Sequence, residues 1–242
     1  MKNSQYNKLF INNKSPKLAV LIDPDKCSDK MIGELKNKSS VPDFILVGGS
    51  HVSVISDKCI AEIKKVVKVP VLLFPGNPIQ ISSAADAVLL LILISGRNPE
   101  YLIGHHVTAA PLIRQHKLET IPTGYMLVGD HAGTSVSYIT QTMPIPENKT
   151  EIIIATDMAG EMTGNRLLYV EAGSGAGKSL KASVISAIRK SVSIPLMSGG
   201  GINDAATAIS HWKAGADVVV VGTAFERNPS LIKSFVKARN RV

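Results

Sequence analysis

The chain has 242 residues, of which 45% are hydrophobic and 19% are charged, and its formal net charge is +8. This composition is that of a globular protein with ample material for a core, and the length suits one (β/α)₈ barrel or two small domains. The positive charge favours an anionic substrate or surface, but the basic residues are scattered and not interleaved with aromatic ones, which argues against nucleic acid as the partner.

The number of cysteines and the hydropathy of the chain indicate the cellular compartment in which the protein is expected. The two cysteines, Cys27 and Cys59, are too few and too isolated for a disulfide framework, so a reducing cytoplasm is expected. The segment Met1–Gln5 lacks the apolar stretch of a signal peptide. The longest apolar run, Ala87–Ile94, has eight residues, whereas about 20 are needed to span a bilayer. Any membrane contact is therefore expected to be peripheral, favoured by the positive charge near anionic lipids.

Short apolar runs recur along the chain, and most are separated by segments of helical period. The runs are Leu18–Ile22, Phe44–Val47, Val71–Phe74, Ala87–Ile94, Thr120–Val128, Leu167–Val170, Ile194–Met197 and Val218–Val221. The helical segments are Asp29–Lys38, Ser53–Lys68, Pro99–Arg114, Ser179–Ser191, Asn203–Ala214 and Pro229–Arg239. Fully apolar runs are typical of parallel strands with both faces buried. The alternation predicts the α/β class and a TIM barrel, built as a single domain over residues 1–242.

Two stretches depart from the strand–helix alternation. After the third run, Pro75-Gly76-Asn77-Pro78 starts a connector with little helical pattern, so an irregular segment is expected in place of the helix after strand 3. The stretch Gly129–Met162 is long and is broken by Pro144 and Pro146.

In a TIM barrel, the chemistry is carried by residues that follow the strands, at their carboxyl ends. Here these positions hold carboxylates, hydroxyls and glycines: Asp23-Pro24-Asp25-Lys26, Gly48-Gly49-Ser50-His51, Phe74-Pro75-Gly76-Asn77, Ser95-Gly96-Arg97-Asn98, Glu171-Ala172-Gly173-Ser174, Ser198-Gly199-Gly200-Gly201 and Gly222-Thr223. Such a rim suits phosphate and metal chemistry.

Three glycine-bearing turns in the last third of the chain predict a phosphate site. They are Tyr169-Val170-Glu171-Ala172-Gly173-Ser174-Gly175, Gly199-Gly200-Gly201-Ile202 and Gly222-Thr223-Ala224-Phe225, each between a strand-like run and a helical pattern. Glycine admits a ligand close to the backbone, and helix N-termini present N–H groups to anions. Barrels commonly bind phosphate on the loops after strands 7 and 8. The alternative is that Gly200 and Gly201 serve only a tight turn.

The run from Gly173 to Ser179 imitates a nucleotide-binding P-loop. That motif needs four residues between its glycines, and here Gly173 and Gly177 enclose three. A simpler interpretation is that Gly173 and Gly175 contact a ligand while Lys178 and Ser179 open the next helix.

Four segments together resemble one known family. Tyr169–Ala176, Leu21–Lys26, Val47–Ser50 and Ser198–Ile202 are similar to segments of the geranylgeranylglyceryl phosphate synthases, and the similarity runs from about Lys17 to the last helix. The resemblance implies a TIM barrel that uses Mg²⁺ to transfer a geranylgeranyl group from geranylgeranyl diphosphate to the C3 hydroxyl of sn-glycerol 1-phosphate. It also implies a homo-oligomer, a dimer or a hexamer.

Residue by residue, the resemblance implies that Asp23 and Ser50 hold the Mg²⁺ ion. Hard oxygen ligands and a shared phosphate are what this ion prefers. The alternatives are a turn role for Asp23 before Pro24 and a helix-cap role for Ser50 ahead of His51.

The resemblance also implies a glycerol phosphate site. Its residues are Tyr169, Val170, Glu171, Ala172, Gly173, Ser174, Gly175, Gly199, Gly200, Gly222 and Thr223. Glu171 is the candidate catalytic residue, to orient or deprotonate the attacking hydroxyl, because it is the carboxylate at that strand end. Tyr169 could equally be a core aromatic residue.

The chain departs from the family pattern at two positions. Leu21 stands where many members have Lys, so Lys26 or Arg97 becomes the candidate to meet phosphate charge. Thr223 stands where many have Asn, and it keeps a backbone donor and a hydroxyl.

Several histidines, one aspartate and the single tryptophan are also considered for roles. His105 and His106 diverge by about 100° on a helix and cannot share one ion, so solvated or capping roles are expected. Asp130-His131 is an acid–base pair only by juxtaposition, and His51 is a candidate for reaching the diphosphate. Trp212 is expected to pack on the helix before the last strand.

Two rival functions remain open from the sequence. One is a phosphate-binding isomerase or lyase of the sugar-phosphate type, which requires a second acid–base residue at a strand end and no Mg²⁺. The other is a non-catalytic phosphometabolite binder, which would tolerate loss of Asp23.

Overall fold

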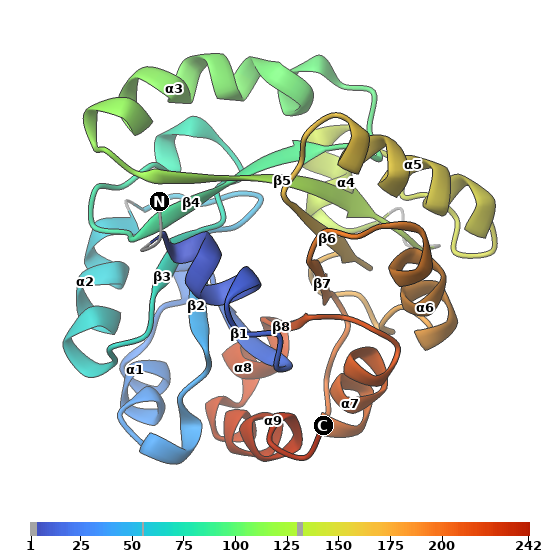
Figure 1. Ribbon diagram of the computed structural model, residues 1–242. Coiled ribbons are helices and arrows are strands. Elements are labelled where there is room, and N and C mark those ends of the chain that lie inside the picture. Colours follow the sequence, from blue (N-terminus) through green and yellow to red (C-terminus); the bar gives the residue numbers. More distant parts are fainter. Residues whose placement is uncertain (1–3, 55, 130–132) are drawn as a thin grey trace.

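A computed structural model describes residues 4–54, 56–129 and 133–242. The strands follow one another round a closed parallel barrel in which β8 pairs with β1 (Figure 1). They are β1 (Lys17–Ile22), β2 (Phe44–Val47), β3 (Val71–Leu73), β4 (Ala87–Leu93), β5 (Glu119–Leu127), β6 (Leu167–Glu171), β7 (Leu196–Gly199) and β8 (Val218–Val221). The predicted TIM barrel is confirmed.

Most strand positions are apolar because both faces of most strands are buried. In β1, Ala19 points into the barrel, where it packs with Phe44 and Leu46 of β2. Leu18 and Val20 point outward and pack against the surrounding helices. The alternation of polar and apolar residues that marks a half-exposed strand is therefore missing.

Helices surround the barrel (Figure 1). They are α1 (Asp29–Leu35), α2 (Ser56–Val66), α3 (His105–Gln115), α4 (Ser135–Thr140), α5 (Thr150–Met162), α6 (Ala182–Ser191), α7 (Ala205–Lys213), α8 (Thr223–Arg227) and α9 (Ile232–Arg239). The helical segments predicted from period are confirmed, although most of the helices are shorter than the predicted segments, and two of them begin at a side-chain cap. Ser28 accepts a hydrogen bond from the N–H of Met31 at the start of α1, and Asp204 accepts one from Thr207 at the start of α7.

The connector after β3 is irregular, as predicted. It contains only the short 3₁₀ turn η4 (Pro78–Gln80). The Gln80 side chain is buried, donates to the carbonyl of Gly49 (2.9 Å) and accepts from the N–H groups of Gly49 and Gly76 (3.3 Å each). The connector is thus fastened to the loop after β2 instead of forming a helix along the outside of the barrel.

The stretch from Gly129 to Met162 contains two helices that the sequence did not reveal, α4 and α5. The buried face of α5 is formed by Ile153, Asp157 and Gly160, so only one of these three positions is a large apolar residue. The helical period is hidden for that reason. The predicted pair Asp130-His131 lies outside the described residues.

A helical turn before β1 covers the amino-terminal end of the barrel (Figure 1). This turn, η1 (Asn7–Ile11), buries Leu9 and Phe10, and Phe10 meets the Phe44 ring edge-on at 5.9 Å. The Trp212 side chain is buried and its Nε1 donates to the carbonyl of Lys17 (3.0 Å), which confirms the predicted packing role. Because this end is closed by packing, a ligand must reach the barrel from the opposite rim.

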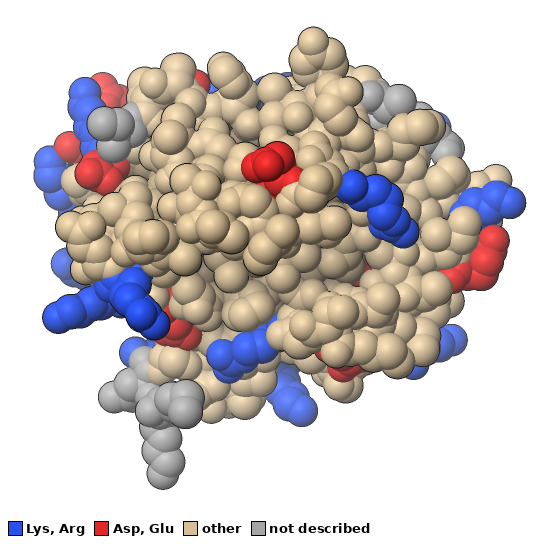
Figure 2. Space-filling view, turned by 90° about the horizontal axis from the view of Figure 1, so that it is seen from above, with Lys and Arg blue, Asp and Glu red and all other residues tan. Residues whose placement is uncertain are grey.

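Figure 2 shows the face of the molecule over α3, and charged side chains are sparse on it although the chain carries a net charge of +8. Ile103 and Val107 are exposed there. Across the part of the chain that the structure describes, no helix has both the length and the apolarity needed to cross a membrane.

Candidate active site

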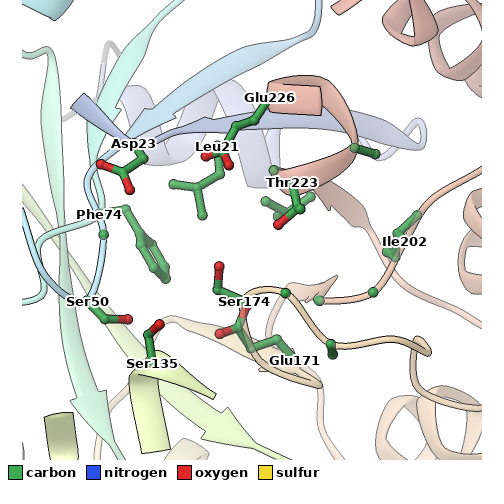
Figure 3. A pocket seen from close by; sticks show the side chains of 18 of the residues that line it. Leu21, Asp23, Ser50, Phe74, Ser135, Glu171, Ser174, Ile202, Thr223 and Glu226 are labelled. Atoms are coloured by element: carbon green, nitrogen blue, oxygen red, sulfur yellow. The ribbon is translucent and has the colours of Figure 1, made fainter. Parts of the chain in front are cut away.

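A polar cavity opens at the carboxyl-terminal rim, between loops that follow most of the strands (Figure 3). The structure brings the majority of the predicted site residues to it: Asp23, Ser50, Tyr169, Glu171, Ser174, Gly175, Gly200, Gly222 and Thr223. In Figure 3, Asp23, Phe74 and Ser50 lie on one side of the open space, and Thr223 and Ile202 lie on the other.

Four predicted site residues do not line the cavity. The Val170 side chain points outward from β6 into the layer of helices. Gly199 lies against the Tyr169 ring, with the ring atom Cε2 3.0 Å from the position that a Cβ would occupy. Ala172 and Gly173 lie behind Gly200 and face it with their backbone nitrogens. The geometry therefore does not support the predicted contact of these four residues with a ligand in this cavity.

Gly200 is a cavity position at which the structure requires glycine. Its φ is +73°, and a Cβ there would lie 2.6 Å from the backbone nitrogen of Ala172 and 2.8 Å from that of Gly173. The loops after β6 and β7 are thus pressed together at this point. The tight-turn role weighed for Gly200 is present, and the same residue lines the cavity.

We expect Gly200→Ala to weaken both the fold and anion binding. The left-handed φ and the clash with backbone atoms should lower the free energy of unfolding by about 1–3 kcal/mol. Displacing the loop should weaken binding of a phosphate-bearing anion in the cavity by about 10- to 100-fold. Urea unfolding and calorimetric titration measure the two effects. Gly177→Ala is the control, since a Cβ at Gly177 meets no atom of the described residues within 4 Å.

The last glycine turn places a helix start at the cavity. Thr223 begins α8, and the carbonyl of Gly222 accepts from the N–H groups of Phe225 (2.9 Å) and Glu226 (3.1 Å). The first N–H groups of a helix have no partner within it. Since Gly222 and Thr223 both line the cavity, these groups are available to an anion there.

Glu171 lies at the floor of the cavity in contact with two tyrosines. Its carboxylate accepts hydrogen bonds from the hydroxyls of Tyr125 and Tyr169, the latter at 2.9 Å, and its side chain is only 5% exposed. Burial raises the pKa of Glu171, and the two hydrogen bonds act in the opposite direction. Burial, followed by the charge of Glu171, holds the pKa of each tyrosine well above its usual value. Both tyrosines therefore stay protonated and orient the carboxylate.

Tyr169 combines the two roles that the sequence left open. Its side chain is 1% exposed and packs edge-on against Phe74, with ring centroids 5.4 Å apart. It also lines the cavity, and its hydroxyl is bound to Glu171.

Acidic residues and a lysine occupy the side of the cavity near β1. Lys26 Nζ lies 3.3 Å from a carboxylate oxygen of Asp23 and 3.1 Å from one of Glu226, so it bridges the loop after β1 and helix α8. Partial burial opposes the charged form of Lys26, but the hydrogen bond and charge of Glu226 leave its pKa raised. The lysine charge therefore persists beside Asp23.

The structure supports the alternative turn role of Asp23 but not the alternative helix-cap role of Ser50. Asp23 does act in a turn, because its Oδ1 accepts from the N–H of Asp25 (3.1 Å) at the start of η2 (Pro24–Lys26). Ser50 does not cap a helix, since α2 begins only at Ser56. Within the described residues, no three His, Cys, Asp or Glu side chains are grouped as a metal-binding cluster.

Of the two candidates to replace the missing family lysine, Lys26 lines the cavity and Arg97 does not. Arg97 lines a separate hollow between β4 and α5, and its guanidinium donates to the carbonyl of Gly96 (2.7 Å). The Leu21 side chain lies next to Gly222.

The histidines are placed by the structure as follows. His51 lines the cavity and is exposed. His106 Nε2 lies 2.8 Å from the carbonyl oxygen of Leu91, and His105 Nδ1 lies 3.9 Å from Glu100, so the two rings engage different partners. The solvated or capping role expected for His106 is wrong, because its ring is bound to strand β4.

A second, apolar cavity adjoins the first. It runs along β4 towards α3, is lined by residues such as Leu89, Leu91 and Ala109, and lies beside the helix-free connector after β3. Gly49, Ser50, Phe74 and Tyr125 line both cavities. The two spaces therefore meet next to Ser50.

Several lining residues were not predicted. They are Tyr125, Ser135, Asn203, Glu226 and Arg227, among others. Tyr125 is the residue of β5 that pairs in register with Tyr169 of β6, so both rings point to the same side. Glu226 and Arg227 could have been found from their place one turn after Gly222, whereas nothing in the sequence pattern marks Ser135.

Comparisons with known proteins agree on one family. The PcrB family matches residues 12–239. A geranylgeranylglyceryl phosphate synthase of Chitinophaga pinensis is 47% identical, covering 98% of this chain and 96% of its own. One of Thermococcus kodakarensis is 36% identical, covering 89% and 86%. The structure of the synthase of Thermoplasma acidophilum with its substrate sn-glycerol-1-phosphate is similar with a TM-score of 0.86 at 31% identity, covering 94% of each chain.

Proposed function

The chain belongs to the PcrB family, and from that membership we propose that it is a prenyltransferase of lipid biosynthesis that acts on sn-glycerol 1-phosphate. The donor we propose is geranylgeranyl diphosphate, with transfer to the C3 hydroxyl. The observation that carries the proposal is the shared mouth of two cavities, one polar with glycine turns and a carboxylate, the other apolar.

The glycine turns supply the proposed site for the acceptor phosphate. Gly200 allows close approach of a ligand to the backbone, and Gly222 and Thr223 offer N–H groups at a helix start. The solved relative was crystallised with sn-glycerol-1-phosphate, which supports the same acceptor here.

The opposite side of the polar cavity fits Mg²⁺. Mg²⁺ keeps several waters and is held by one or two carboxylates together with substrate phosphates. Asp23 offers such a carboxylate, and Ser50 offers a hydroxyl where the polar and apolar cavities meet. When bound, the ion would neutralise charge on the departing diphosphate. Lys26 would add a fixed positive charge beside Asp23.

The apolar cavity is the proposed site of the prenyl chain. More than half of its lining residues are Leu, Ile, Val, Phe or Tyr, and it begins at the polar cavity. A donor placed across Ser50 would have its diphosphate on the polar side and its chain along β4. The reacting carbon would then lie between the metal side and the glycine turns.

Glu171 is the proposed catalytic residue. It lies at the end of β6, between the glycine turns and the entrance to the apolar cavity, and two tyrosines fix its orientation. A hydrogen bond from the acceptor hydroxyl to this carboxylate would aim the oxygen at the donor carbon. Most of the acceleration is expected from positioning and charge stabilisation.

Turnover with defined substrates tests the proposed function. The protein is incubated with labelled sn-glycerol 1-phosphate and geranylgeranyl diphosphate, with Mg²⁺ or with EDTA. We expect a butanol-extractable product only with Mg²⁺, and little from sn-glycerol 3-phosphate. No product with Mg²⁺ would refute the proposed transfer, and equal yield from the 3-phosphate would refute the acceptor assignment.

We expect Ala109→Phe to obstruct the apolar cavity. Ala109 lies on the inner face of α3, is 5% exposed and lines that cavity. A larger ring there should raise KM for geranylgeranyl diphosphate roughly tenfold or more, while a shorter farnesyl donor is affected less. Steady-state kinetics with both donors measures this. Ala110→Phe, at the neighbouring exposed position, should change neither value; equal effects of the two variants would contradict the assignment.

A further inference from the structure

The two cysteines, far apart in the sequence, meet beside the rim. Cys27 follows η2 and Cys59 lies in the second turn of α2, and both pack in the same apolar cluster. Cys59 is buried, Cys27 is partly exposed, and the two thiols hydrogen-bond to one another. The expectation from the sequence that they are isolated is therefore wrong in space.

The two thiols are not equivalent. The hydrogen bond from Cys59 lowers the pKa of Cys27. The same bond, burial and the negative charge of Cys27 raise the pKa of Cys59. Cys27 is thus the reachable sulfur with more thiolate character, and Cys59 is a protonated partner held behind it.

The pair lies next to the proposed metal side of the polar cavity. Asp23 begins the same turn, η2, that Cys27 ends. The Asp25 carboxylate in this turn accepts hydrogen bonds from the N–H groups of Ser53 (2.8 Å) and Val54 (3.0 Å), which precede α2. The cysteines therefore form a second link between the same two segments of the rim.

We infer that Cys27 and Cys59 are a modification site, a thiol pair that a low-molecular-weight disulfide such as glutathione disulfide converts into an intramolecular disulfide. The Cys27 thiolate attacks one glutathione sulfur, and the other glutathione leaves as its thiolate, which gives a mixed disulfide. Cys59 then loses its proton and attacks the Cys27 sulfur, expelling the second glutathione. Two protein thiols are oxidised and one glutathione disulfide is reduced to two glutathiones.

The order of these steps follows from the charges. Once Cys27 is in the mixed disulfide, its negative charge no longer opposes ionisation of Cys59. The second attack is therefore made easier by the first. Disulfides in reducing compartments are mostly transient and redox-sensing, which is the behaviour this pair allows.

The new bond should lower turnover by moving η2. Two sulfurs in hydrogen-bond contact must approach to about 2.05 Å when they bond, so Cys27 is drawn towards α2 and the turn carrying Asp23 and Lys26 is displaced. This consequence rests on the proposed function, whereas formation of the bond does not.

Treatment of the protein with glutathione disulfide tests the inference. Thiol titration under denaturing conditions should fall from two thiols per chain to none, with a peptide containing Cys27 linked to one containing Cys59 by mass spectrometry. Amide exchange in peptides around Asp25 should slow. Turnover should fall at least several-fold, and dithiothreitol should restore all three readouts.

Matched variants separate the steps. Cys59→Ser should stop at a stable glutathione adduct on Cys27, and Cys27→Ala should neither react nor lose turnover on treatment. The inference would be overturned if the treated wild type kept two thiols, kept a glutathione adduct, or formed a disulfide between two chains. It would also be overturned if the disulfide form kept full turnover. If the reduced protein shows no turnover, the proposed function fails, while thiol titration and amide exchange still decide the fate of the pair.

Discussion

Asp23→Asn is expected to lower kcat about 100- to 10,000-fold, because loss of charge stabilisation worth several kcal/mol acts on the departing diphosphate. The amide keeps the size of the side chain and an oxygen that can accept from the N–H of Asp25, so η2 should persist. It removes the negative charge that would hold Mg²⁺. Initial rates over a range of Mg²⁺ concentrations measure the effect.

Two comparisons make the Asp23 result decisive. Asp29→Asn is the control, since Asp29 is an exposed acid in the first turn of α1 and does not line the cavity. It should leave kcat unchanged, and both variants should keep the thermal unfolding midpoint of the wild type. Turnover of Asp23→Asn within tenfold of the wild type would refute the metal role. Unfolding of this variant would instead favour the turn role alone.

Asp157→Ala is expected to stabilise the protein near neutral pH. The Asp157 side chain is fully buried in α5, and neither carboxylate oxygen has a hydrogen-bond partner among the described residues. Burial raises its pKa from 3.8 to about 8. Such a shift makes the native protein less stable by about 4 kcal/mol at pH 7, at 1.36 kcal/mol for each pH unit.

The sign of the pH dependence follows from proton binding. Between pH 3.8 and about 8, the native protein holds a proton on Asp157 that the unfolded chain has released. Each rise in pH within this window therefore lowers the stability of the wild type, and the variant lacks this loss. Its advantage should be about 5 kcal/mol at pH 7.5 and about 1 kcal/mol at pH 4.5.

Urea unfolding at pH 4.5 and 7.5 measures the Asp157 effect. Glu151→Ala is the control, because Glu151 is an exposed acid on the same helix and its removal should change stability by only about 0.5 kcal/mol at either pH. A variant at Asp157 that is less stable than the wild type at pH 7.5, or equally stabilised at both pH values, would contradict the raised pKa of the native carboxyl group.

The strands could be predicted from the sequence because their environment is uniform. Each strand of the barrel is covered inside and outside, so runs such as Val218–Val221 are apolar at every position. The rim residues followed from this, since a parallel barrel gathers the ends of all its strands at one edge. Asp23 and Gly200 were placed correctly at the cavity on that ground.

The features that could not be predicted from the sequence depend mostly on contacts between elements far apart in the chain. The register that brings Tyr125 beside Tyr169 is set by strand pairing, which a single apolar run does not reveal. The ion pair between Lys26 and Glu226 joins the loop after β1 to helix α8, which follows β8. Helix α5 was missed because Asp157 occupies its buried face, so a feature unfavourable to stability also conceals the helical period.

The most direct test of the central claim, that the polar and apolar cavities meet and together hold both substrates, is a crystal structure. The crystal would contain sn-glycerol 1-phosphate, Mg²⁺ and a non-reactive analogue of geranylgeranyl diphosphate. We expect the acceptor phosphate between the turns at Gly200 and Gly222, the ion beside Asp23, and the prenyl chain along β4. Placement of the acceptor phosphate outside the polar cavity, or of the prenyl chain outside the apolar one, would contradict the proposed reaction geometry.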